Sequence, residues 1–131
     1  MTSNVSYRIL ESDEIAVHTV RPGFSSDGIL RSIADRLDDP NYAKGMGVVW
    51  HMTRGCKVLG LAENSNLHSQ AQQLAADWAP YRVAFVGEEN LQFGCFRQMV
   101  SLGSSRGFHY HVFHDLQSAM DWVKQPIPPQ P

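Results

Sequence analysis

The sequence predicts one α/β domain, in which helices cover a mostly parallel sheet that begins with an antiparallel hairpin. Two adjacent extended segments open the chain, and strand-like apolar runs then alternate with helical patterns. The length of 131 residues suits a single domain that buries its own core. The predicted order is ββαβαβαβα over residues 1–124, and a Pro-rich flexible tail follows at 125–131.

The hairpin is predicted from residues 5–10 and 14–22, two extended segments that are joined by the polar stretch ESDE. Side chains in a strand alternate between the two faces of its sheet. In the second segment this places one set on each face: Ile15, Val17 and Thr19 on the first, and Ala16, His18 and Val20 on the second.

The first helix is predicted within residues 24–40, where apolar residues recur every four positions. That stripe consists of Ile29, Ile33 and Leu37. Ser25, Ser26 or Asp27 is expected to cap the start of the helix, because each has a side-chain oxygen that accepts a backbone N–H. Pro40 prevents the helix from continuing.

The middle of the chain predicts a buried strand at 45–52, a helix at 64–80 and a second buried strand at 81–87. The apolar stripe of this helix is expected to contain Leu67, Ala71, Leu74, Ala75 and Trp78. Repeated strand–helix–strand steps imply right-handed crossovers, and therefore parallel pairing of the strands that they connect.

The last third predicts a helix within residues 88–107, a strand at 108–113 and a final helix at 116–123 that Asp115 caps. The residues expected to face inward are Phe96, Met99 and Val100 in the first of these helices, and Leu116, Ala119, Met120 and Val123 in the second.

The composition excludes several classes of function. The net charge is −2 and the basic residues are scattered, so nucleic acid is not an expected partner. No apolar run approaches the ~18 residues of a membrane span, and the first residues lack the pattern of a signal peptide. Cys56 and Cys95 lie far apart without CxxC spacing, which indicates two reduced thiols in a cytosolic protein.

A candidate binding site is predicted at the carboxyl ends of the strands, where ligands of open parallel sheets usually sit. His51, Thr53 and Arg54 follow one buried strand, and their hydrogen-bond donors suit an anion. The following helix carries Phe93, Gly94 and Arg97, and a glycine there permits close approach of a ligand or of neighbouring backbone. The alternative for His51 is a histidine at the edge of the core, with Arg54 in solvent.

Two further chemistries remain open. A thiol or histidine enzyme would use Cys56 beside Lys57 and near His51. A zinc module would use His109 and His111, which share a strand face, although a stable site needs three or four ligands. No Walker loop, GxSxG elbow, GxGxxG turn or HExxH helix is present, so neither a cofactor nor catalysis is expected.

Four stretches together resemble a bacterial family of small STAS-like domains. They are DDPNYAKG (38–45), RVAFVG (82–87), FGCFRQM (93–99) and VFHDLQSAMDWV (112–123). Members of this mostly uncharacterised family are distant relatives of sporulation anti-sigma-factor antagonists, and they are also compared with CRAL-TRIO lipid-carrier folds. The resemblance implies a non-enzymatic regulatory domain that binds a partner protein or a small anionic or amphipathic ligand.

The chain departs from this family at two places. His51 stands where the family tends to have an aspartate near the end of the central strand. Regulators that are switched by phosphorylation carry Asp-Ser at the following helix start, whereas residues 52–66 offer only Thr53 and the more distant Ser65. We also expect that an exposed edge at the last strand allows a homodimer.

Overall fold

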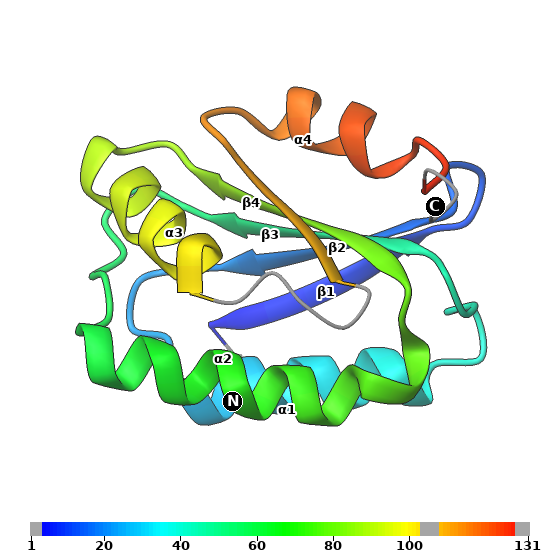
Figure 1. The fold of residues 1–131 in the computed structure, drawn as a ribbon, viewed down its shortest axis with the longest axis horizontal. Helices are drawn as coiled ribbons and strands as arrows, with labels where there is room; N and C mark the ends of the chain where they lie inside the picture. The colour runs from blue at the N-terminus through cyan, green and yellow to red at the C-terminus, as the bar shows by residue number, and fades with distance from the viewer. Residues whose placement is uncertain (1–3, 103–107, 128–131) are drawn as a thin grey trace.

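The computed structural model describes residues 4–102 and 108–127, and its strands form one five-stranded sheet (Figure 1). The elements follow the predicted order: β1 (Val5–Leu10), β2 (Ile15–Val20), α1 (Ser26–Asp38), β3 (Gly47–Met52), α2 (Leu61–Ala75), β4 (Tyr81–Gly87), α3 (Asn90–Leu102), β5 (Phe108–Phe113) and α4 (Leu116–Val123). The strands lie side by side in the order β1-β2-β3-β4-β5. β1 and β2 pair antiparallel and the other three pairings are parallel, which confirms the predicted hairpin and the mostly parallel sheet.

Helices cover both faces of the sheet unequally. α1, α2 and α3 lie on one side, and α4 alone crosses the other (Figure 1). We call the first side the three-helix face, whose core includes Ala16, Val20, Val48, Val83 and Phe108. We call the second side the α4 face, whose core consists of Ile15, Val17, Val49, Ala84, Val86, Ala119 and Val123. The predicted alternation along β2 is therefore confirmed, because its odd and even residues belong to different cores.

Side-chain caps define where two of the helices begin. Ser25 is the cap of α1, and its hydroxyl accepts the backbone N–H of Gly28 at 3.0 Å. Asp115 caps α4 as predicted, and its carboxylate accepts the backbone N–H of Ser118 at 2.8 Å. Each cap pairs a backbone donor that the first turn of a helix leaves without an intrahelical partner.

The predicted second helix was wrong at both ends. α2 begins at Leu61, three residues earlier than expected, and after Ala75 the chain continues as a 3-10 turn at Ala76–Trp78. Leu74 is 45% exposed, although it was assigned to the inward stripe. The side of α2 that faces the sheet carries Asn64, Ala71 and Ala75. With the helix in this orientation, Leu74 lies at the edge of the buried side and is partly in solvent.

Two predictions concern segments at the margins of the structure. The expected mobile tail begins in the described chain, where Arg82 donates a hydrogen bond to the carbonyl of Pro126 at 3.1 Å, but residues 128–131 lie outside it. Residues 103–107, which were expected to close the third helix, also lie outside the described residues. Among the helices that are described, none has both the length and the apolar character needed to cross a lipid bilayer.

Candidate functional site

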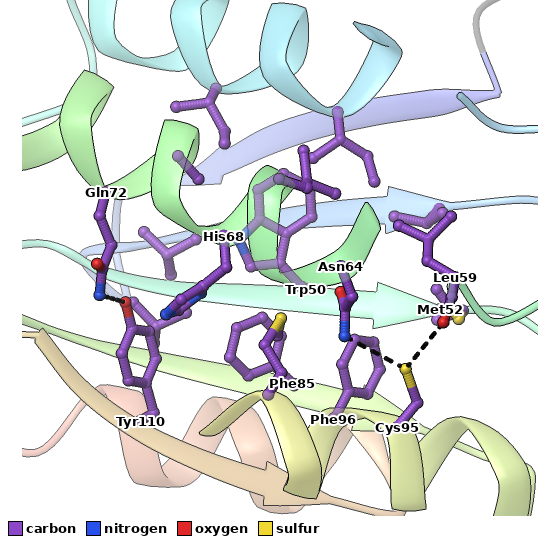
Figure 2. Close-up of a pocket in the computed structure, with 18 of the residues that line it drawn as sticks. Trp50, Met52, Leu59, Asn64, His68, Gln72, Phe85, Cys95, Phe96 and Tyr110 are labelled. Atoms are coloured by element: carbon purple, nitrogen blue, oxygen red, sulfur yellow. Dashed lines mark hydrogen bonds between the residues drawn. The ribbon is translucent and has the colours of Figure 1, made fainter. Parts of the chain in front are cut away.

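A cavity of about 100 Å³ lies between the three-helix face of the sheet and the helices that cover it. Figure 2 shows how strands and helices contribute to it from opposite sides. Trp50, Phe85 and Tyr110 come from three neighbouring strands, while Asn64, His68 and Gln72 come from α2. The cavity is therefore enclosed by elements that are far apart in the sequence. The strand–helix–strand crossovers bring these elements together by placing the helices over the sheet.

Most of the cavity wall is apolar. The sheet supplies Val48, Val83 and Phe85, and the helices supply Ile33, Leu67 and Phe96. Aromatic rings stack in part of this wall, with the centroids of Phe85 and Phe96 5.0 Å apart. Apolar surface of this kind favours the hydrophobic part of a ligand, because the ligand leaves water on binding.

A row of polar side chains runs along α2 beside the apolar wall. Asn64, His68 and Gln72 are spaced four residues apart, so they lie on one side of the helix. The Gln72 amide donates a hydrogen bond to the hydroxyl of Tyr110 at 2.9 Å, and burial raises the pKa of Tyr110 to about 12. The Asn64 amide donates to the Cys95 sulfur at 3.4 Å (Figure 2). These contacts fix the orientation of polar groups at the boundary of the cavity.

A buried polar group lies between α1 and the sheet. Nη1 of Arg36 lies 3.1 Å from Nε2 of His18, and because a guanidinium only donates, this nitrogen of the imidazole accepts. Nδ1 of His18 then carries the proton and donates to the Ser32 hydroxyl at 2.8 Å. The His18 ring also stacks on Trp50 with centroids 3.8 Å apart and an 8° interplanar angle. His18 is thus held as a neutral ring.

Burial lowers the pKa of His18 well below 6.5, and the neighbouring Arg36 guanidinium lowers it further. Arg36 itself lines the cavity, and its side chain is only 2% exposed. Its guanidinium carbon lies 5.1 Å from the ring centroid of Tyr42, which provides a cation–π contact. Within the described structure its Nε has no hydrogen-bond partner. The Arg36 guanidinium is therefore a cation in the lining of a mostly apolar cavity, and its Nε–H has no hydrogen-bond acceptor in the described structure.

The residues that the sequence predicted as a binding site lie away from this cavity. His51 projects on the α4 face, where its Nε2 lies 3.7 Å from a carboxylate oxygen of Glu88. The Thr53 hydroxyl donates to the carbonyl of Val20 at 3.1 Å, which ties the end of β3 to β2. Arg54 is exposed. These three residues follow one strand, but their side chains do not converge on the cavity.

The predicted residues of α3 are also outside the cavity. The Phe93 ring stacks on His114 with centroids 3.7 Å apart, and Arg97 is exposed. A Cβ atom at Gly94 would meet no atom of another element within 4 Å, so no neighbouring backbone approaches this glycine closely, and the expected approach of a ligand there stays a prediction. Gly87 instead permits close approach of α3, because a Cβ there would lie 2.7 Å from the backbone nitrogen of Phe93.

A hydrogen-bond network joins the first turn of α3 to the loop after β3. Gln92 is 1% exposed, and its amide donates to the carbonyl of Thr53 and to the carboxylate of Glu89, both at 2.9 Å. The same carboxylate accepts the backbone N–H of Gly55 at 2.8 Å. The backbone carbonyl of Thr53 is therefore held at the start of α3 by its hydrogen bond with Gln92.

The two thiols are in environments that oppose nucleophilic chemistry. The Cys56 thiol donates to the carbonyl of Val20 at 3.3 Å, and Cys95 contacts the Leu59 carbonyl at 4.0 Å. Burial is the largest cause that raises the pKa of both thiols. Since a thiolate is the reactive form, a raised pKa reduces the population that can attack a substrate near neutral pH.

The histidines of β5 face the same side as α4. The register places His109 beside Arg82 and His111 beside Ala84, and the His111 ring lies 5.5 Å from that of Trp122. Over residues 4–102 and 108–127, no group of three or more His, Cys, Asp or Glu side chains is placed to hold a metal ion.

Sequence reasoning missed the residues that define the cavity, although two signals were present. Arg36 lies seven residues after Ile29 and three after Ile33, which places it on the inward stripe of α1. His18 lies in an otherwise apolar strand, on the same face as Val20. A charged residue on an apolar helical stripe and a histidine on the facing strand together indicate a buried polar group.

The comparisons with known proteins do not assign this chain to a family. No family model matches it, and neither a curated protein nor a solved structure matches it. The interpretation of the site therefore depends on its geometry and on the chemistry of its residues.

Proposed function

We propose that this protein is a non-enzymatic STAS-like domain that binds a small amphipathic ligand in the cavity under α1, α2 and α3. The observation that carries this proposal is the cavity of about 100 Å³, which combines an apolar wall with a few oriented polar groups. This combination is typical of small-molecule sites, in which apolar contacts supply affinity and polar contacts orient the ligand. The free thiols and the STAS resemblance support a cytosolic regulatory role.

The volume limits the class of ligand. An engineered apolar cavity of ~150 Å³ binds benzene, so a cavity of about 100 Å³ admits only a compact ligand. A compact aromatic ring or a short branched chain approaches this size, whereas a long acyl chain exceeds it. The preferred ligand is therefore small, with one apolar end and one polar end.

The alternative functions receive less support from the geometry. A thiol enzyme around His51 and Cys56 requires an activated thiol, whereas the Cys56 thiol is buried and its pKa is raised. A zinc module at His109 and His111 requires further ligands, and no such cluster occurs over the part of the chain that the structure describes. The two sheet edges, β1 and β5, are the places where a homodimer or a partner strand would add.

Thermal unfolding in the presence of small amphipathic acids, amides, alcohols and amines tests the proposal. A ligand at ~100 times its dissociation constant stabilises the native state by about 2.7 kcal/mol, which is easily seen as a rise in melting temperature. Ala71→Leu extends a side chain of the cavity lining into the cavity, so it is expected to abolish that rise.

Ala62→Leu is the matched control, because it makes the same change at an exposed position of the same helix. The proposal predicts that Ala62→Leu keeps the full response to the ligand. A library in which no compound shifts the melting temperature, or a response that Ala71→Leu and Ala62→Leu share equally, would show that the cavity is not the binding site.

A further inference from the structure

Arg36 is a buried cation that the protein does not pair with a carboxylate. All 13 acidic side chains of the chain lie within the described residues. Ion pairs among these residues join His51 to Glu88 and Lys124 to two aspartates, and Arg36 takes part in none of them. Burying a charge is costly unless it is paired, so an arginine that is 2% exposed and has no counter-ion needs an explanation.

The contacts of Arg36 account for only part of its hydrogen-bonding capacity. The Nη1 group donates to His18, a further hydrogen bond joins the guanidinium to the Tyr81 side chain, and the Tyr42 ring packs against the guanidinium carbon. The Nε–H is buried and has no acceptor in the described structure. The Nε–H and an adjacent Nη–H form a planar edge of the guanidinium, which matches the two oxygens of a carboxylate.

The cavity that Arg36 lines is suited to a single negative charge. Arg36 is the one lysine or arginine among the described residues that line it. The surrounding wall includes Ile33, Val48 and Val83, which neither donate nor accept hydrogen bonds through their side chains. A second charge on the ligand would find no second lysine or arginine in this lining, so the cavity favours a monoanion over dicarboxylates and phosphates.

We propose that the ligand is a small monocarboxylic acid with a compact apolar tail, and that its carboxylate pairs with the Nε edge of Arg36 while the tail fills the cavity. This inference rests on the proposed function and names the ligand class of the same site. The acid supplies the counter-ion that Arg36 lacks, and the apolar wall supplies the favourable burial of the tail.

Isothermal titration of the wild-type protein with matched acids and amides tests this inference. The probes are benzoate with benzamide, and isovalerate with isovaleramide, which are similar in shape and differ in charge. Each acid is expected to bind at least about tenfold more tightly than its amide, because a hydrogen bond to a charged group contributes more than a neutral one. Ala71→Leu is expected to abolish binding of the acids, which would place them in the cavity.

Arg36→Met removes the cation and keeps an unbranched side chain, and Arg31→Met makes the same change at an exposed position of α1. Arg36→Met is expected to weaken binding of the acid at least about tenfold and to leave the amide within about threefold, whereas Arg31→Met changes neither. Arg36→Lys keeps the charge without the planar edge, so it is expected to fall between these results.

The outcomes separate this inference from the proposed function. If acid and amide bind equally to the wild-type protein, the role of Arg36 is wrong, although the cavity still binds ligands. If neither the acids nor the amides bind while another compound shifts the melting temperature, the proposed ligand class is wrong. If no compound binds or shifts the melting temperature, both proposals fail. If Arg36→Met does not fold, the wild-type comparison of acid with amide decides the question alone.

Discussion

At one level of the sheet, β2, β3 and β4 present small aliphatic side chains to the α4 face, whereas the next residue of each strand presents a planar ring to the three-helix face. Neighbouring residues show the contrast: Val17 precedes His18, Val49 precedes Trp50, and Ala84 precedes Phe85. The α4 face is packed by one helix, which comes so close to the sheet that a Cβ at Gly47 would lie 2.6 Å from the carbonyl oxygen of Val123. The three-helix face retains a cavity of about 100 Å³.

This difference shows how one sheet combines a close-packed core with a binding site. Small residues allow a helix to approach the strands and leave no space between them, which is the usual state of a protein interior. Rings and hydrogen-bonded polar groups, such as His18 with Arg36, have fixed shapes and partners, so helices over them cannot close every gap. We therefore expect the α4 face to determine stability and the three-helix face to determine binding.

Replacing Gly47 with alanine is expected to have the largest effect on stability. The added Cβ would clash with the backbone of Val123, and backbone cannot move aside as a flexible side chain does. Gly47→Ala should therefore lower the free energy of unfolding by about 3 kcal/mol or more, measured by urea denaturation.

Gly94→Ala is the control, because a Cβ at this helical position meets no atom within 4 Å. It is expected to raise the free energy of unfolding by up to about 1 kcal/mol, through the higher helix propensity of alanine. Equal effects of the two substitutions would mean that α4 does not pack against β3 as closely as the structure shows.

Adjacent valines of β3 provide a smaller and sharper test of the two faces. Val48 lines the cavity and Val49 belongs to the α4 core, and both are completely buried. Val49→Leu is expected to cost about 1–3 kcal/mol by overpacking, whereas Val48→Leu should cost less than ~1 kcal/mol because its extra methylene enters the cavity. The free energies of unfolding from urea titrations measure both. The reverse order would show that the free space lies on the other face.

The pH dependence of stability tests whether His18 is a neutral buried ring. Of the three predicted effects on stability, this one is the smallest near neutral pH. Burial and Arg36 lower the pKa of native His18, whereas the unfolded chain has the ordinary value of 6.5. Below 6.5 the unfolded state therefore binds a proton that the native state does not, and stability is lost as the pH falls. The loss attributable to this ring should be about 1 kcal/mol over the first pH unit below 6.5, and its slope approaches about 1.4 kcal/mol per pH unit further below.

His18→Gln is expected to remove this slope between about pH 6.5 and about pH 5.5, as measured by urea denaturation at several pH values. The groups that face the ring are Ser32 and Arg36 of α1, Tyr7 of β1 and Trp50 of β3. His111→Gln, at an exposed position, is the control that should keep the wild-type slope. An unchanged slope in His18→Gln would contradict a neutral buried ring.

The order of elements and the division of residues between the two faces were predictable from the sequence. Both depend on local periodicity: alternation in strands such as β2, and spacings of three and four in helices such as α1. The cap at Asp115 was also predictable, since it depends on a side chain and a backbone group three residues apart. The main local error was Leu74, where the apolar pattern of α2 did not reveal how the helix is rotated about its axis.

The cavity and its polar groups were decided only by the tertiary structure. His18 and Arg36 are 18 positions apart in the chain, and they meet because the crossover from β2 to β3 places α1 over the sheet. The general tendency of ligands to bind at strand ends directed the sequence-based prediction to His51 and Arg54, which lie outside the cavity. Local patterns state which residues point inward, but the distances between inward-pointing residues of different elements arise only when those elements pack together.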